Sequence, residues 1–299
     1  MTMPKARVRW ILGLCSALAV SGMWINAQAQ SRTPDVIYVP TPHDVVAEML
    51  RIAGVTSNDV VYDLGSGDGR VVIAAAARHG ARGVGVDIDP RRIQEGRANA
   101  RQAGVTDRVQ FLEQDLFTTD LREASVVTLY LLPSLNVQLR PKLLAELRPG
   151  TRVVSYDFDM DDWSPDQVLV MPEASYKDTV YYWVIPAEVA GVWRWRVPTP
   201  TGEQRYALRL EQRFQEVSGT ISSDAGETPI TDARLTGDQL QFSAATGGAQ
   251  GRQVKLSFNG RVSGNTMQGR VEVQDGESAG QQHWTAHRDT DGTTPTPKR

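Results

Sequence analysis

Hydrophobic positions follow one pattern in the first half of this 299-residue chain and a different pattern in the second. From about Tyr38 to Pro186, apolar runs rich in β-branched residues alternate with segments of helical period, which predicts β/α units and a largely parallel sheet. From about Gly191 to Arg288 the helical period is absent. Short alternating segments separated by Gly, Asn, Asp and Ser predict an antiparallel meander or barrel there. We therefore expect the α/β fold class, with a smaller all-β domain after the sheet.

The predicted strands are short and regularly spaced in both halves. In the first half they are expected at Val60–Tyr62, Gly83–Val86, Val109–Leu112, Ser125–Leu131, Thr151–Tyr156 and Val180–Ile185. In the second half they are expected at Gly191–Val197, Gln204–Leu210, Phe214–Ile221, Ile230–Leu235, Gln239–Ala245, Gln253–Asn259, Thr266–Val273 and His283–His287. Four tryptophans are expected in hydrophobic cores rather than as surfaces for stacking a ligand: Trp163, Trp193, Trp195 and Trp284.

The first thirty residues have the layout of a secretory signal peptide. Three basic residues precede an apolar run at Trp10–Ile25, and the small-residue motif Ala27–Ala29 follows it. The run is short for a membrane-spanning helix, which needs about twenty residues. We expect cleavage after Ala29 and an exported or periplasmic protein, with an uncleaved membrane anchor as the alternative. Removal takes away three of the 32 basic residues and the only cysteine, leaving a net charge of −6.

Composition bounds the classes of protein that remain. The expected organisation is a signal peptide at 1–29, an α/β domain at 30–188, an all-β accessory domain at 189–290 and a disordered tail at 291–299. A chain with 35 acidic against 32 basic residues does not favour a sequence-blind nucleic-acid binder. One cysteine excludes an internal disulfide and a thiolate zinc site. His283 and His287 would lie about 13 Å apart on a strand, so no metal site is expected.

Polar residues follow several of the predicted parallel strands at the edge where such sheets bind ligands. Asp63–Gly69 follows the first strand, Asp87 ends the second and Asp115 follows the third. The glycines allow a ligand to approach the backbone closely. Asp87 is placed to accept hydrogen bonds from two ribose hydroxyls, and Asp115 from an adenine amine, with Leu116 and Phe117 beside the base.

Two nucleotide cofactors compete for such a site. A dinucleotide expects G-x-G-x-x-G, because its pyrophosphate lies against the helix. Here the spacing is G-x-G-x-G, Asp63 precedes it, and Arg70 stands where the third glycine of the dinucleotide motif would be. An acidic residue beside the glycine loop suits a ligand with an ammonium group. S-adenosylmethionine, which carries an ammonium, a carboxylate, a ribose and an adenine, fits better.

These motifs resemble those of class I S-adenosylmethionine-dependent methyltransferases. The resemblance lies in Asp63–Arg70 (DLGSGDGR), Gly85–Pro90 (GVDIDP) and Gln114–Leu116 (QDL). Further segments resemble the lysine methyltransferases that modify the ATP synthase c subunit and the adenine nucleotide translocase: Tyr38–Pro42 (YVPTP), Thr128–Ser134 (TLYLLPS) and Val153–Tyr156 (VVSY). The resemblance covers residues 36–186 and implies a Rossmann-like class I methyltransferase sheet. The second half of the chain has no part in it.

The resemblance also implies roles for individual residues. Asp63 and the glycine loop would hold the methionine end of the cofactor, Asp87 the ribose and Asp115 the adenine, while Tyr38 and Thr41 would form a lid. Tyr130 would line an aromatic channel for the acceptor, which makes it the candidate catalytic residue. The implied cofactor-binding set is Tyr38, Thr41, Asp63, Gly65, Ser66, Gly67, Asp68, Gly69, Asp87, Ile88, Asp115 and Leu116.

The function that follows is an S-adenosylmethionine-dependent methyltransferase acting on a protein lysine, with a membrane or envelope protein as one class of substrate. Thr128–Ser134 lacks the Asn-Pro-Pro-Tyr of enzymes that methylate planar amides or bases, which disfavours nucleic acid. Two alternatives stay open: an exported protein that binds such a ligand without catalysis, and a small-molecule methyltransferase. The acidic residues after the fifth strand either attract a cationic substrate or form a solvated loop: Asp157, Asp159, Asp161 and Asp162.

Overall fold

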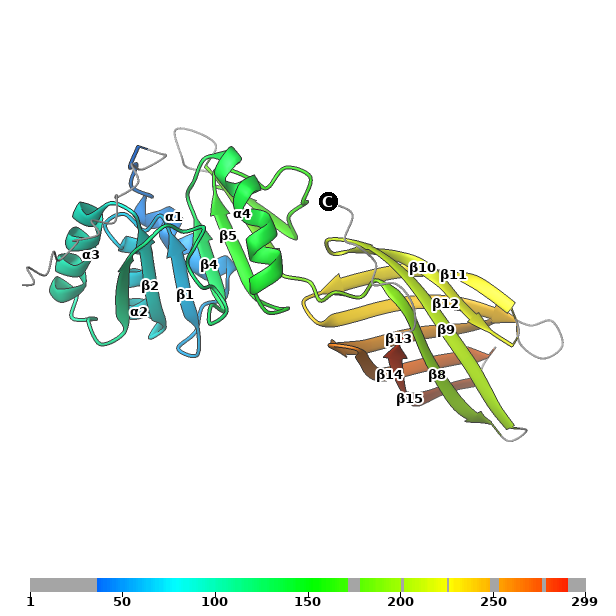
Figure 1. Cartoon of the computed structure of the whole chain (residues 1–299). Helices are drawn as coiled ribbons and strands as arrows, with labels where there is room; N and C mark the ends of the chain where they lie inside the picture. Colours follow the sequence, from blue (N-terminus) through cyan, green and yellow to red (C-terminus); the bar gives the residue numbers. More distant parts are fainter. Residues whose placement is uncertain are drawn as a thin grey trace, which may run out of the picture. The chain divides into compact units, whose positions relative to one another are not determined.

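The alternating segments of the first half form a seven-stranded mixed sheet (Figure 1). Its elements are α1 (His43–Ile52), β1 (Val60–Leu64), α2 (Arg70–His79), β2 (Arg82–Asp87), α3 (Pro90–Gln102), β3 (Val109–Glu113), β4 (Val126–Leu129), α4 (Pro133–Glu146), β5 (Arg152–Tyr156), β6 (Gln167–Val170) and β7 (Thr179–Val184). The strand order is β3-β2-β1-β4-β5-β7-β6. Strands β1 to β5 are parallel, and β7 is antiparallel to both β5 and β6.

The computed structural model describes residues 37–171, 178–199, 202–224, 226–247, 253–275 and 278–289. The predicted signal peptide and the predicted tail at 291–299 lie outside these residues, so cleavage, anchoring and export stay predictions. Within the described part of the chain, no helix combines the length and the apolar character needed to cross a membrane.

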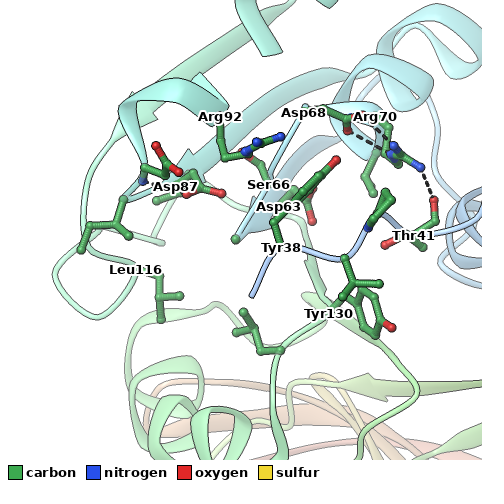
Figure 2. A pocket seen from close by; sticks show the side chains of 18 of the residues that line it. Tyr38, Thr41, Asp63, Ser66, Asp68, Arg70, Asp87, Arg92, Leu116 and Tyr130 are labelled. Carbon is green, nitrogen blue, oxygen red and sulfur yellow. Dashed lines mark hydrogen bonds and ion pairs between the residues drawn. The ribbon is translucent and has the colours of Figure 1, made fainter. Parts of the chain in front are cut away.

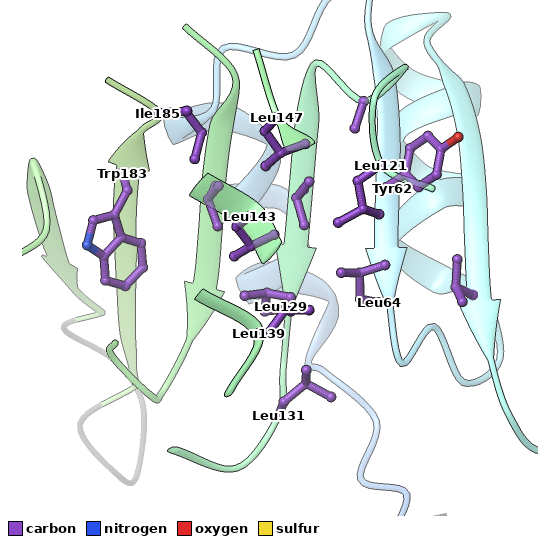
Figure 3. Packing of buried hydrophobic residues seen from close by; sticks show 14 of the residues in the cluster. Tyr62, Leu64, Leu121, Leu129, Leu131, Leu139, Leu143, Leu147, Trp183 and Ile185 are labelled. Carbon is purple, nitrogen blue, oxygen red and sulfur yellow. The ribbon is translucent and has the colours of Figure 1, made fainter. Parts of the chain in front are cut away.

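Side chains that alternate along the strands supply hydrophobic clusters on both faces of the sheet. Tyr62 and Leu64 of β1 pack with the leucines of α4, such as Leu139, in the cluster drawn in Figure 3. Val61, the residue before Tyr62, packs with α1 and α2 on the other face. On β2, a Cβ at Gly83 would lie 2.7 Å from Cβ of Val72, so glycine lets α2 pack directly against the strand.

The local sequence signals are confirmed at one helix and wrong at another. Asp89 caps α3: its Oδ1 accepts a hydrogen bond from the backbone N–H of Arg91, and a proline begins the helix. The same pattern in Thr41-Pro42 predicts that Thr41 caps α1, but the helix begins one residue later and Pro42 precedes it without a side-chain cap. Strand β6 was not predicted, because it is a short edge strand whose four residues show no alternating burial.

The second half forms a closed barrel of eight antiparallel strands in which each strand pairs with its neighbours in the chain. They are β8 (Gly191–Thr199), β9 (Gly202–Arg213), β10 (Glu216–Ser223), β11 (Gly226–Thr236), β12 (Gln239–Gly247), β13 (Gln253–Ser263), β14 (Thr266–Asp275) and β15 (Ser278–Arg288). Pairing of β15 with β8 closes the barrel. The predicted fold class, an α/β sheet followed by an all-β barrel, is confirmed.

The barrel interior is packed with aromatic side chains. Trp193, Trp195 and Trp284 are buried there, as predicted, and Trp195 contacts the rings of Phe258 and Trp284. Phe214 was predicted in a strand, but it lies in the turn between β9 and β10 with a positive φ of 56°. The turn was not predicted, because the neighbouring residues alternate between apolar and polar as in a strand. No glycine or asparagine marks a turn in this stretch.

Candidate functional site

A pocket of about 310 Å³ lies at the carboxyl ends of β1, β2, β3 and β4, with residues 37–41 along one side (Figure 2). Ten of the twelve residues predicted to bind the cofactor line it, together with Tyr130. The two exceptions are Gly67 and Gly69. Residues as far apart in the chain as Asp63 and Tyr130 therefore meet in one cavity, as expected where parallel strands end at the same edge.

Asp63 is the most strongly perturbed carboxyl group of the pocket. It is 6% exposed, and its Oδ1 accepts a hydrogen bond of 2.7 Å from the hydroxyl of Thr128 on the neighbouring strand β4. Burial, together with the nearby carboxylates of Asp87 and Asp68, raises the pKa of Asp63 to about 7. A cation brought next to it would favour the ionised form, so the pocket offers a site for an ammonium group.

The glycine loop holds Asp87 in a fixed orientation. The backbone N–H of Gly67 donates to Asp87 Oδ2 at 2.9 Å, and the N–H of Asp89 donates to Asp87 Oδ1 at 2.9 Å. Each carboxylate oxygen retains a lone pair for a further donor. The N–H groups of Gly65 and Ser66 both donate to the carbonyl of Val86, which ties the loop to the end of β2.

Gly67 and Gly69 make room for aromatic rings rather than lining the pocket. A Cβ at Gly67, which has φ of +52°, would lie 2.2 Å from the ring of Tyr38. A Cβ at Gly69, with φ of +80°, would lie 2.5 Å from the ring of Phe111. Both positions therefore require glycine for backbone conformation and for space.

The segment at residues 37–41 is held over the glycine loop by two arginines. Arg92 of α3 lies over the ring of Tyr38, with 4.4 Å between Cζ and the ring centroid. Arg70 donates to the carbonyl of Thr41 at 2.7 Å and pairs with Asp68 at 2.7 Å. Neither arginine was predicted from the sequence to belong to the site. The position of Arg70, where a dinucleotide motif has its third glycine, could have indicated that Arg70 belongs to the site. No local pattern indicated Arg92.

The other walls of the pocket are mainly apolar. Asp115, after β3, accepts a hydrogen bond at Oδ1 from the N–H of Phe117 at 2.9 Å, and the hydroxyl of Thr119 donates to its carbonyl. Leu116 and Ile88 also line the pocket. This end of the cavity thus presents a carboxylate beside apolar side chains, which suits a purine with an exocyclic amine.

Tyr130 lies in an aromatic group at the end of β4. Its ring centroid is 4.4 Å from that of Tyr156 and 6.3 Å from that of Phe158. The hydroxyl of Tyr156 donates to Asp178 Oδ1 at 2.7 Å. Burial and the carboxylates of Asp157 and Asp178 raise the pKa of Tyr130, which keeps its phenol neutral. The acidic residues after β5 differ in their surroundings. Asp157 lies near Tyr130, whereas Asp162 pairs with Arg140 and Arg213.

Comparison with known proteins identifies the family. Residues 63–167 match the family described as ANTKMT methyltransferase domain. A protein-lysine N-methyltransferase of Saccharolobus islandicus is 47% identical over 156 residues, which are 52% of this chain and 97% of that protein. The chain belongs to this family of lysine methyltransferases. A lysine N-methyltransferase of Mus musculus, named for the c subunit of ATP synthase, is 35% identical over 43% of this chain, which spans 51% of that protein.

Solved structures are also similar to the first half of this chain. An RNA methyltransferase of Salinibacter ruber, in complex with S-adenosylhomocysteine, is 57% identical over 50% of this chain and 96% of that chain, with a TM-score of 0.49. The expected enzyme class and the expected cofactor, S-adenosylmethionine, are confirmed for this methyltransferase. The binding-only and small-molecule alternatives find no support in these relatives. The residue roles within the pocket stay predictions.

The pocket of the methyltransferase fits its cofactor chemically. Ser66 lines the pocket, and its buried hydroxyl has no hydrogen-bond partner among the described residues. The buried carboxyl of Asp63 likewise favours a cationic neighbour. An amino-acid group with an ammonium and a carboxylate supplies partners for both. In the part of the chain that the structure describes, no group of three or more His, Cys, Asp or Glu is arranged to hold a metal ion.

Proposed function

We propose that this methyltransferase modifies the side-chain amine of a lysine in a protein. The observation that carries the proposal is the aromatic group around Tyr130, which borders the cofactor pocket and lies near the carboxylates of Asp157 and Asp178. An amine acceptor arrives as an ammonium ion, and both aromatic faces and carboxylates attract such an ion.

The cofactor, when bound, supplies an electrophilic methyl group on a sulfonium. Asp63 and Ser66 would bind its amino-acid end, the two oxygens of Asp87 its ribose hydroxyls, and Asp115 with Leu116 its adenine. The arginine-held segment at Tyr38 and Thr41 would cover it and exclude water. Because methyl transfer is an in-line displacement, these contacts act by orientation, and most of the rate gain comes from alignment.

The acceptor amine attacks only after it has lost a proton. The rings of Tyr130, Tyr156 and Phe158 provide apolar walls, and desolvation against such walls lowers the pKa of an amine. Asp157 and Asp178 would attract the ammonium on its way in, and the ring face of Tyr130 would orient the amine. The methyl acceptor would thus be captured as a cation and react as a neutral amine.

The expected substrate is a protein of the cell envelope or membrane. Two of the relatives named above are lysine N-methyltransferases by name, and one of these is named for the c subunit of ATP synthase. The signal-peptide layout of residues 1–29 supports export of this chain. Export would bring the enzyme into contact with envelope proteins.

Labelling with radioactive S-adenosylmethionine tests the proposal. The full chain is incubated with an envelope protein fraction, and in parallel with total RNA and with a low-molecular-mass extract. We expect label in protein, and mass spectrometry should place it on lysine. Label in RNA or in small molecules alone would reject the lysine assignment.

Two variants separate binding from transfer. Asp87→Ala should abolish binding of S-adenosylhomocysteine in calorimetry and remove all labelling. Asp107→Ala is the matched control, because Asp107 is an exposed aspartate outside the pocket. Equal loss in both variants would point to a general folding defect, and no loss in either would reject the assigned cofactor site.

A further inference from the structure

The loop between β5 and β6 connects the acceptor side of the pocket with the barrel. At its beginning, Phe158 stacks on Tyr130, with an interplanar angle of 14°. The amide of Asn136 on α4 holds this end, since its Nδ2 donates to the carbonyls of Phe158 and Asp159 at 3.2 and 3.1 Å. The loop contains two residues other than glycine with positive φ, Asp157 at 66° and Asp161 at 59°.

The far end of the same loop is bound by the turn between β9 and β10. The indole Nε1 of Trp163 donates to Gln215 Oε1 at 2.8 Å, and Gln215 Nε2 donates to the carbonyl of Ser164 at 2.6 Å. Trp163 is fully buried. Arg213 of the barrel donates to Asp162 Oδ2 at 2.6 Å. One glutamine side chain thus satisfies both a buried donor and a backbone acceptor of the loop.

Phe214 also contacts Trp163, and its backbone has a conformation that is unfavourable for phenylalanine. Its φ of 56° lies in the left-handed region, where glycine and asparagine are usual. Its ring stacks on Trp163 at 5.7 Å, and the guanidinium of Arg140 lies 5.3 Å from the ring centroid. The amide of Gln212 donates to its carbonyl at 2.7 Å, which holds the turn. Such backbone strain persists where the surroundings over-determine it.

We propose that the β9–β10 turn, Arg213–Gln215, is a positioning element for the acceptor side of the methyltransferase site. The turn fixes Asp162–Ser164, the loop transmits that constraint to Phe158, and Phe158 sets the face of Tyr130 that an acceptor meets. The proposed cofactor contacts lie at the carboxyl ends of β1, β2 and β3 and in residues 37–41, so they are predicted to be unaffected. The idea rests on the proposed function, and it gives the barrel a role in acceptor use.

Gln215→Leu in the full chain tests the proposal, because leucine keeps the volume and removes both hydrogen bonds. We expect amide hydrogen exchange in residues 157–164 to rise about tenfold, and kcat/KM for the acceptor protein to fall about tenfold. The Kd for S-adenosylhomocysteine should stay within about twofold of the parent value. Gln215→Glu keeps an acceptor for Trp163 Nε1 and should recover part of the loss.

The control is Gln268→Leu, an exposed glutamine on β14 that takes no part in these contacts. Unchanged exchange in residues 157–164 together with unchanged kcat/KM for Gln215→Leu would overturn the proposal, as would a parallel loss of cofactor affinity. Faster exchange in the loop with no effect on acceptor kinetics would also overturn it. If the parent chain methylates no protein, the proposed function fails instead, and the exchange measurement still tests the coupling between turn and loop.

Discussion

Binding of the cofactor to this methyltransferase should release a proton from Asp63. In the free protein, burial and the nearby Asp87 and Asp68 raise the pKa of this carboxyl to about 7. An ammonium group bound beside it would favour the carboxylate and lower that pKa toward its ordinary value near 4. At pH 6 Asp63 is then mostly protonated before binding and ionised afterwards, so each binding event releases about 0.9 proton.

The magnitude follows from the difference of about three pKa units, which corresponds to about 4 kcal/mol. With these values the apparent affinity for the cofactor is about tenfold lower at pH 6 than at pH 8, and about eightyfold lower at pH 5 than at pH 8. The pH dependence of the folding stability has the opposite sign to that of the cofactor affinity. Between about pH 4 and 7 the folded protein binds more protons than the unfolded chain, so the free protein loses stability as the pH rises through this window.

Calorimetry with S-adenosylhomocysteine, in two buffers of different ionisation enthalpy, measures the released protons directly. Asp63→Asn should show no release and an affinity that is flat from pH 5.5 to 8. The control Asp107→Asn changes an exposed aspartate outside the pocket and should behave as the parent. Equal affinity of the parent at pH 6 and pH 8, or proton release that persists in Asp63→Asn, would refute the reasoning.

Three further predictions follow from single side chains. Gly67→Ala places a Cβ against the ring of Tyr38 at a positive φ, so the free energy of unfolding in urea should fall by about 1 kcal/mol and cofactor affinity should drop. An unchanged Kd would exclude the role of Tyr38 as a lid. Asn136→Leu removes three hydrogen bonds from a fully buried amide and should cost about 2 kcal/mol in the same assay; a loss below about 0.5 kcal/mol would contradict this. Tyr130→Phe should keep most of the acceptor kcat/KM and Tyr130→Ala should lower it about tenfold. Equal loss in both Tyr130 variants would assign the role to the hydroxyl instead of the ring.

Many residues of the cofactor pocket could be predicted because the sequence patterns that mark them are local. Asp63–Arg70 combines a strand end, a glycine loop and a helix start within eight residues, and Asp89-Pro90 marks the next helix by its cap. Parallel strands place their carboxyl ends at one edge, so residues such as Asp87 and Asp115 had to meet. The eight strands of the barrel could be predicted for a similar reason, because alternating side chains and turn residues are also local signals.

Contacts between distant segments were decided only by the tertiary structure. Arg70 reaches the carbonyl of Thr41, and Arg92 lies over Tyr38, yet no periodicity relates these pairs. The pKa of Asp63 depends on which carboxylates surround it after folding, and the sequence does not contain that distance.

The sequence by itself determined the alternation of elements, the glycine loop and the family, because each rests on residues that are neighbours in the chain. Only the tertiary structure decided that Gly67 faces Tyr38, that Phe214 forms a turn, and that this turn meets Trp163. The physical reason is the range of the interactions. Backbone conformation and amphipathic period act within a few residues, whereas packing and electrostatics join groups that the chain brings together only when it folds.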